Sequence, residues 1–275
     1  MYRLMRTLLM VSIAGAFPAK SEAQTVGLGL RPARLEIEGV PGKSKTASFM
    51  IESPPSDTDV RGRLIMSLTD WTIEPDTSMK YFDAGTQPDS ASSWITFSPT
   101  DLTINSGQQR MVRVTANVPP GTRPGVYRSG IFVQERPPAK QPQNGERLVF
   151  FRFRYVVTLY VIVQPVTRQG EAADFQLVTD ARGMRLTCQL KNAGTFYLRP
   201  YISWFVRSGQ QEIIVEKNVE ATVLLPAATT NETLVIRNPL PPGQYEMEAQ
   251  IDFHDGRPIQ ALKRSVEISA PSKRE

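Results

Sequence analysis

Hydrophobic and polar residues alternate with a period of two along most of this chain. The clearest alternating stretches are residues 47–52, 111–116, 185–190 and 245–253. Successive side chains of a β-strand point to opposite faces, so each stretch buries one face and exposes the other to water. No long segment has the three-to-four-residue spacing of an amphipathic helix. The pattern therefore predicts an all-β protein.

Proline, glycine and asparagine mark the turns between these stretches. The turn signals are Val40-Pro41-Gly42, Asn105-Ser106-Gly107, Pro119-Pro120-Gly121, Asn192-Ala193-Gly194, Pro241-Pro242-Gly243 and His254-Asp255-Gly256. Many short strands separated in this way predict β-sandwiches. A boundary near residues 164–170 divides the chain into residues 24–165 and 166–275. Each part has the length of one immunoglobulin-like domain.

The segment 147–163 (RLVFFRFRYVVTLYVIV) predicts an unusually long strand. Its first half carries a row of large apolar side chains on one face: Val149, Phe151, Phe153 and Tyr155. One small sandwich does not need so many large apolar residues. Two interpretations remain open: an ordinary core strand with a bulge, or a strand whose first half is exposed for pairing with another chain.

The N-terminus has the pattern of an export signal. Arg3 and Arg6 precede the apolar stretch 7–17, and Ser21-Glu22-Ala23 supplies small residues at the positions that a signal peptidase reads. Residues 1–23 are therefore predicted to be a signal peptide, removed before Gln24. Two alternative cleavage positions follow Ala16 and Ala19, and an uncleaved membrane anchor is the other interpretation. We expect a soluble mature protein in an exported compartment.

Composition and charge narrow the function. The chain has 275 residues, 40% of them hydrophobic, which is enough to bury a core and excludes general disorder. The net charge is +5, or +3 without residues 1–23, and this mild excess does not favour nucleic acid. One His and one Cys are too few for a histidine-based catalytic site or a multi-cysteine zinc site. Cys188 falls on the apolar, buried face of its alternating stretch, and His254 lies at a turn. We expect no metal, no cofactor and no enzymatic activity.

Several motifs resemble one family. They are residues 30–34 (LRPAR), Ser98-Pro99 followed by Gly107 and residues 111–114 (MVRV), residues 125–138, residues 190–197 (LKNAGTFY), Leu225-Pro226 and residues 251–256 (IDFHDG). In their order and spacing, over residues 28–268, they resemble the PapD-like periplasmic pilus-assembly chaperones. The resemblance implies two immunoglobulin-like domains in a periplasmic protein. It also implies a chaperone that binds exported pilin-like subunits by donating a β-strand, and that delivers them for assembly, with an outer-membrane usher as a further partner.

The resemblance also implies site residues. Arg34 stands at the family's basic position, where an arginine and a lysine hold the carboxylate at a subunit's C-terminus. Thr158 stands at the position of that lysine, and Arg154 has the parity to supply the charge from nearby. The donor strand corresponds to Val149, Phe151, Phe153 and Tyr155. A homodimer that covers this strand is a second expectation for the protein without its subunit.

Two other functions remain open on the sequence. Sandwich architecture serves many functions, so a structural or adhesive cell-envelope protein of two immunoglobulin-like modules is the main alternative. An enzyme is disfavoured because a Ser-His-Asp site would have to use His254, and the sequence has no GxSxG motif. Exposure of Val149, Phe151 and Phe153 separates the first two hypotheses, because only a strand donor needs these side chains uncovered.

Overall fold

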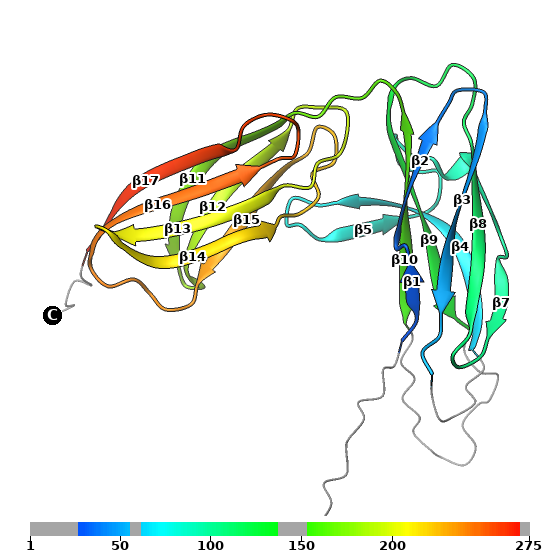
Figure 1. Cartoon of the computed structure of the whole chain (residues 1–275), viewed down its shortest axis with the longest axis horizontal. Coiled ribbons are helices and arrows are strands. Elements are labelled where there is room, and N and C mark those ends of the chain that lie inside the picture. Colours follow the sequence, from blue (N-terminus) through cyan, green and yellow to red (C-terminus); the bar gives the residue numbers. More distant parts are fainter. Residues whose placement is uncertain (1–26, 56–61, 137–152, 270–275) are drawn as a thin grey trace, which may run out of the picture.

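The computed structural model describes residues 27–55, 62–136 and 153–269. They form two β-sandwiches that lie at an angle to each other and open toward one side (Figure 1). Within these residues the only helix is one 3-10 turn, η1 (Ser92–Trp94), and no helix has the length and apolarity needed to cross a membrane. The prediction of an all-β protein with two immunoglobulin-like sandwiches is confirmed.

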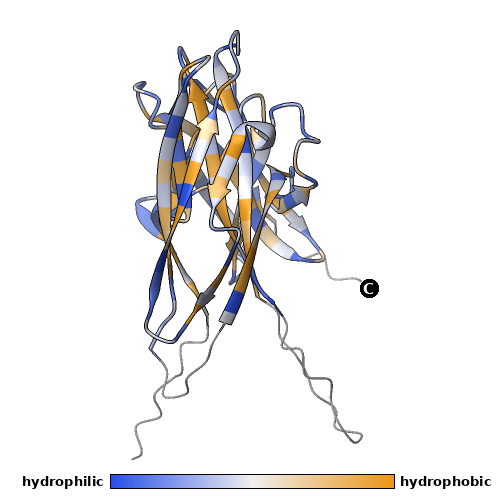
Figure 2. Ribbon diagram, turned by 90° about the vertical axis from the view of Figure 1, so that its right-hand side faces the viewer, coloured by the Kyte–Doolittle hydropathy of each residue, from blue (hydrophilic) through white to orange (hydrophobic). Residues whose placement is uncertain are grey.

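The first sandwich is built from two sheets. One sheet has the order β1 (Gly29–Arg31), β3 (Ser44–Glu52), β8 (Gln109–Asn117) and β6 (Ile95–Ser98). The other has the order β2 (Arg34–Gly39), β10 (Arg154–Val163), β9 (Gly125–Glu135), β4 (Gly62–Ile73) and β5 (Met79–Phe82), with β7 (Asp101–Ile104) also paired to β4. The alternation seen in the sequence is visible as orange and blue bands along these strands (Figure 2). Phe49, Ile51, Val112 and Val114 fill the space between the sheets.

The second sandwich repeats this arrangement with different strands. Its sheets have the orders β11 (Gly170–Asp180), β12 (Gly183–Asn192), β15 (Thr229–Ile236), and β14 (Gln211–Glu220), β13 (Tyr201–Ser208), β16 (Gly243–Asp252), β17 (Gln260–Ile268). Cys188 is fully buried in the core between them, as its parity predicted. Burial raises the pKa of its thiol to about 12, so the group is a small apolar core side chain rather than a nucleophile.

Residues 164–169 connect the two sandwiches, between the end of β10 and the start of β11. A separate apolar cluster fills the junction. It contains Trp71, Val126, Tyr160 and Ile162 from the first domain, and Phe196, Tyr197 and Leu225 from the second. The β4–β5 hairpin extends from the first domain toward the second (Figure 1), where the Thr230 hydroxyl lies 3.5 Å from the Pro75 carbonyl oxygen. The junction is therefore a packed interface to which both domains contribute side chains.

Candidate functional site

Strand β10 has partners on both sides along only part of its length. All of Arg154–Val163 pairs with β9, whereas only residues 158–163 pair with β2. Among the described strands, residues 154–157 therefore have a single neighbour. The Thr158 N–H donates to the Ala33 carbonyl, 3.0 Å away, on the β2 side. Backbone groups alternate between the two edges of a strand, so the N–H and C=O groups of Arg154 and Val156 point to the open edge.

Side chains at and just before the start of β10 (Arg154–Val163) are exposed, whereas those a few residues later are buried. Phe153 is 42% exposed, while Val157 has no exposed surface and packs in the core of the first sandwich. Tyr155 lies between them: its hydroxyl accepts a hydrogen bond of 3.0 Å from the Leu28 N–H, and its ring centre is 6.3 Å from that of Phe153. Two members of the predicted donor row, Val149 and Phe151, lie outside the described residues.

Arg34 and Thr158 are direct neighbours in the parallel pairing of β2 and β10. The Arg34 side chain is 40% exposed, and its Nε lies 3.0 Å from Glu36 Oε1. The Thr158 hydroxyl is 3.4 Å from the Ala33 carbonyl oxygen. The Arg34 guanidinium and the Thr158 hydroxyl thus belong to neighbouring residues, at the position where β2 joins β9 as a partner of β10.

Arg154 lies elsewhere. It is four residues from Thr158, or about 13 Å along the strand, and its Nε donates to Gln134 Oε1 at 3.2 Å. Its guanidinium sits 4.8 Å from the centre of the Phe132 ring, beside a surface hollow that Tyr81 also lines. Arg154 therefore belongs to the outer face of the sheet, and the structure does not bring it to Arg34.

The junction between the domains contains residues that the sequence did not single out. The Tyr197 hydroxyl, from the second domain, donates a short hydrogen bond to Glu36 Oε1. Its ring stacks on that of Tyr160, with centres 4.2 Å apart. Burial, and then the hydrogen bond to Glu36, raise the pKa of Tyr197 above its ordinary value, so the phenol stays protonated and remains a donor. The only feature of the sequence that pointed to Tyr197 was its position at the end of the motif 190–197.

Buried polar groups fix this part of the second domain. Asn192 is fully buried, and its amide nitrogen donates to the carbonyls of Phe196 (2.8 Å) and Leu224 (3.0 Å). Gly194 lies so close to the connecting segment that an added Cβ would come within 2.5 Å of the Thr167 carbonyl oxygen. Only glycine fits there. Asn192 and Gly194 thus hold the backbone that precedes Tyr197, whose side chain contacts the first domain.

A second guanidinium lies beside the apolar cluster of the junction. Arg128, on β9, is buried and pairs with Asp89 at 2.6 Å, while its carbon Cζ lies 5.6 Å from the Trp71 ring centre. Burial lowers the pKa of Arg128, and the negative charge of Asp89 opposes this. Its Nε is buried without a hydrogen-bond partner within the described residues.

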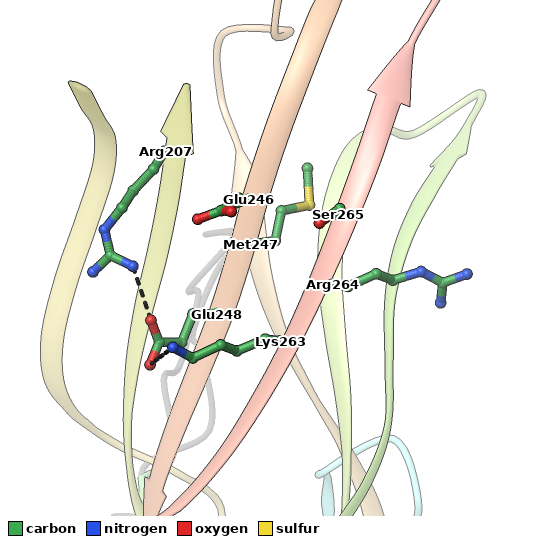
Figure 3. Close-up of a pocket in the computed structure, with 7 residues that line it drawn as sticks. All are labelled: Arg207, Glu246, Met247, Glu248, Lys263, Arg264 and Ser265. Carbon is green, nitrogen blue, oxygen red and sulfur yellow. Dashed lines mark hydrogen bonds and ion pairs between the residues drawn. The ribbon is translucent and has the colours of Figure 1, made fainter. Parts of the chain in front are cut away.

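Another charged hollow lies on the outer face of the second domain (Figure 3). Glu248 is buried there between Arg207, at 2.8 Å, and Lys263, at 3.8 Å. These residues come from three adjacent strands, β13, β16 and β17, so the network links the strands to one another. Among the described residues, no three His, Cys, Asp or Glu side chains are grouped as a metal site would require. His254 lies at the turn after β16 and pairs with Asp252.

Comparison with known proteins gives only structural matches. No family model and no curated protein matches the sequence. Among the solved structures that resemble this chain is the class 5 fimbriae chaperone CfaA, with 9% identity over 89% of this chain and 100% of that one, and a TM-score of 0.46. The CsuC–CsuE chaperone–subunit complex of Acinetobacter baumannii gives 13% identity, 86% and 97% coverage, and a TM-score of 0.46. The Salmonella enterica SafB chaperone, in complex with SafA pilin, has 15% identity over 88% of this chain and 96% of that one, with a TM-score of 0.43. Each of the three matched structures is of a fimbrial or pilus chaperone, alone or with a subunit.

Proposed function

We propose that this protein is an exported, periplasmic chaperone that binds pilin-like subunits by adding a β-strand to them. The observation that carries the proposal is the half-paired strand β10, whose residues 154–157 have β9 on one side and no described strand on the other. An open strand edge supplies backbone donors and acceptors to an incoming chain, which is the β-augmentation mode of recognition. The exposed side chain of Phe153, which directly precedes β10 and has its ring centre 6.3 Å from that of Tyr155, adds an apolar anchor.

Arg34 completes the proposed site. A subunit strand that runs along the open edge of β10 toward Thr158 would bring its C-terminal carboxylate to Arg34. Guanidinium groups hold carboxylates well because they offer two parallel donors. Arg34 pairs with Glu36 through its Nε, which lies 3.0 Å from Glu36 Oε1. Delivery to an outer-membrane usher, and a homodimer that covers the open edge, are extensions of the same proposal.

Two substitutions at one position, Val156, test the open edge. Val156→Pro removes an N–H that points away from β9, and proline is tolerated on the free side of edge strands. We expect it to leave the melting temperature nearly unchanged and to abolish capture of subunits when tagged protein is purified from a periplasmic extract and its partners are identified by mass spectrometry. Val156→Thr, which keeps the N–H, is the matched control and should capture the same proteins as the natural chain.

The alternative is a structural or adhesive envelope module, which uses the same fold without donating a strand. If Val156→Pro and Val156→Thr capture the same proteins, the open edge is not the binding surface, and the structural module becomes the better account. Unfolding of Val156→Pro would show that this edge is covered in the native protein, which also contradicts the proposal.

A further inference from the structure

We propose that the second domain sets the orientation of Arg34, with Tyr197 and Glu36 as the positioning residues. This inference rests on the proposed function, in which Arg34 receives the carboxylate of a subunit. It makes a site on the first domain depend on a side chain of the second domain, through residues particular to this chain.

One oxygen atom of Glu36 contacts side chains from both domains. Glu36 Oε1 lies 3.0 Å from Arg34 Nε, and the same oxygen accepts the short hydrogen bond from the Tyr197 hydroxyl. Arg34 and Glu36 are two positions apart on β2, so their side chains lie on the same face of this strand. Within the described residues, Glu36 is the only acidic residue that forms an ion pair with Arg34. The position of the Arg34 guanidinium therefore depends on where Glu36 is held.

The Tyr197 hydroxyl is the fixed end of this set of contacts. Tyr197 is only 4% exposed, and its ring stacks on those of Tyr160 and Phe196, with centres 4.2 and 4.5 Å away. The backbone that follows is held as well, because Leu198 exchanges two hydrogen bonds of 2.9 Å with Leu224. A phenol that is fixed in this way restricts where the carboxylate that accepts its proton can lie.

The ion pair between Arg34 and Glu36 does not supply this order by itself. The two side chains are 40% and 39% exposed. An ion pair in such surroundings contributes little, because water screens the charges and both long side chains lose rotational freedom. A hydrogen bond from a buried donor changes this balance, since it restricts the carboxylate before the arginine pairs with it.

The charges are consistent with this arrangement. Burial and the hydrogen bond to Glu36 raise the pKa of Tyr197, and the positive charge of Arg34 opposes this rise. Arg34 is therefore close enough to act on the phenol. The phenol stays protonated at neutral pH, so it remains a donor to Glu36.

An oriented guanidinium binds a carboxylate more tightly than a mobile one. Immobilising a long side chain opposes binding, and here the contacts of the protein itself restrict Arg34 before a subunit arrives. Glu36 contacts Arg34 at Nε, and the two Nη groups are the parallel donors that can bind both oxygens of a carboxylate. Displacement of Tyr197 would release Glu36, so the affinity of the site depends on the domain arrangement.

Nuclear magnetic resonance on the full mature chain measures the order of Arg34 directly. The Arg34 Nε–Hε signal is assigned with Arg34→Lys, and its order parameter is obtained from nitrogen relaxation. We expect Tyr197→Phe, which removes one hydroxyl and keeps the ring, to lower this order parameter. Tyr245→Phe is the matched control, because it removes the hydroxyl of another buried tyrosine of the second domain, which donates to the Pro241 carbonyl at 2.8 Å. It should leave Arg34 unchanged.

A double-mutant cycle tests whether Tyr197 acts through Glu36. Glu36→Ala should lower the order of Arg34 at least as much as Tyr197→Phe does, and Tyr197→Phe should have no further effect in the Glu36→Ala background. Glu36 lies on the exposed face of β2, so Glu36→Ala provides the measurement even if Tyr197→Phe does not fold. Arg63 Nε, which donates to Asp101 at 2.9 Å in the first domain, is the internal reference and should stay unchanged in every variant.

Titration with N-acetylvaline connects the order of Arg34 to binding. N-acetylvalinamide, which lacks the carboxylate, is the ligand control. In the natural sequence the Arg34 Nε–Hε signal should shift with the acid and not with the amide. Tyr197→Phe should weaken binding of the acid by about two- to tenfold, whereas Tyr245→Phe should bind it as the natural chain does. Melting temperatures of both variants show whether they are folded.

Two results would overturn the inference. If Tyr197→Phe leaves either the order of Arg34 or the affinity for the acid unchanged, the second domain does not position Arg34 for binding, and the proposed chaperone function stands without this contribution. If the natural chain does not bind the acid, the carboxylate role of Arg34 is wrong and the inference is wrong with it. Strand donation is tested separately by Val156→Pro, so its failure is distinguishable from both results.

Discussion

The buried carboxylate of Asp70 holds the β4–β5 hairpin in place. Asp70 lies at the base of this hairpin, and its carboxylate accepts hydrogen bonds from Ser92 Oγ (2.6 Å), Ser90 Oγ (2.7 Å) and the Gln87 N–H (2.9 Å). Burial alone raises the pKa of Asp70, but these hydrogen bonds outweigh it and hold the pKa below its ordinary value. The folded protein therefore favours the charged form.

The lowered pKa gives a pH-dependent prediction for Asp70→Asn. The stability from the charged form is fully present above the unfolded pKa, about 3.9, and is lost as pH falls through the lower folded value. We expect Asp70→Asn to lower the free energy of unfolding by about 1.5–3 kcal/mol at pH 7, and by less at pH 3, in urea titrations. Asp76→Asn changes an exposed carboxylate of the same hairpin and should have little effect. An equal loss at both pH values would contradict the prediction.

At the scale of elements, β10 combines a core strand with an exposed one. Its exposed start and its buried end follow each other without any interruption in the pairing with β9. We expect Val157→Ser to lower the melting temperature by several degrees or more, because burying a valine contributes about 1.5–3 kcal/mol and the new hydroxyl would lack a partner. Phe153→Ser, four residues earlier on the same face, should leave the melting temperature nearly unchanged.

Calorimetry of the two variants measures this contrast, and subunit capture measures its functional side. Phe153→Ser should reduce capture while Val157→Ser reduces stability. If both variants unfold at the same lowered temperature, the start of β10 is ordinary core, and an envelope module explains the chain better than a chaperone does.

At the scale of the whole molecule, the tyrosine stack determines how firmly the domains are held. Tyr197 contributes both a ring contact to Tyr160 and the hydrogen bond to Glu36. Each domain keeps its own core, so Tyr197→Ala should loosen the domain arrangement with little loss of domain stability. We expect a larger radius of gyration in small-angle X-ray scattering. Tyr201→Ala, which removes an aromatic contact to His254 within the second domain, should not change it; an equal radius for both variants would contradict the prediction.

The sequence determined the elements and most of their faces. Alternation over 47–52, 111–116, 185–190 and 245–253 predicted the strands around β3, β8, β12 and β16, because the parity of a strand is a local property of neighbouring side chains. The burial of Cys188 followed from the same rule, and the turn at His254 followed from the turn signal His254-Asp255-Gly256. The resemblance assigned Thr158 to the family's lysine position. In the structure Thr158 pairs with Arg34 in the register of β2 and β10, and the role of the two residues stays a prediction.

Only the tertiary structure decided what surrounds those residues. Arg154 has the parity that the anchor requires, yet Phe132 and Gln134 on the adjacent strand hold it elsewhere. Tyr197 contacts Glu36 and Tyr160 from the second domain, more than 150 positions further along the chain than Glu36. The position of a residue in the alternating pattern specifies the face of the strand on which its side chain lies. Its neighbours on that face depend on the order of the strands and on the packing of the domains. Contacts between segments far apart in the sequence decide both.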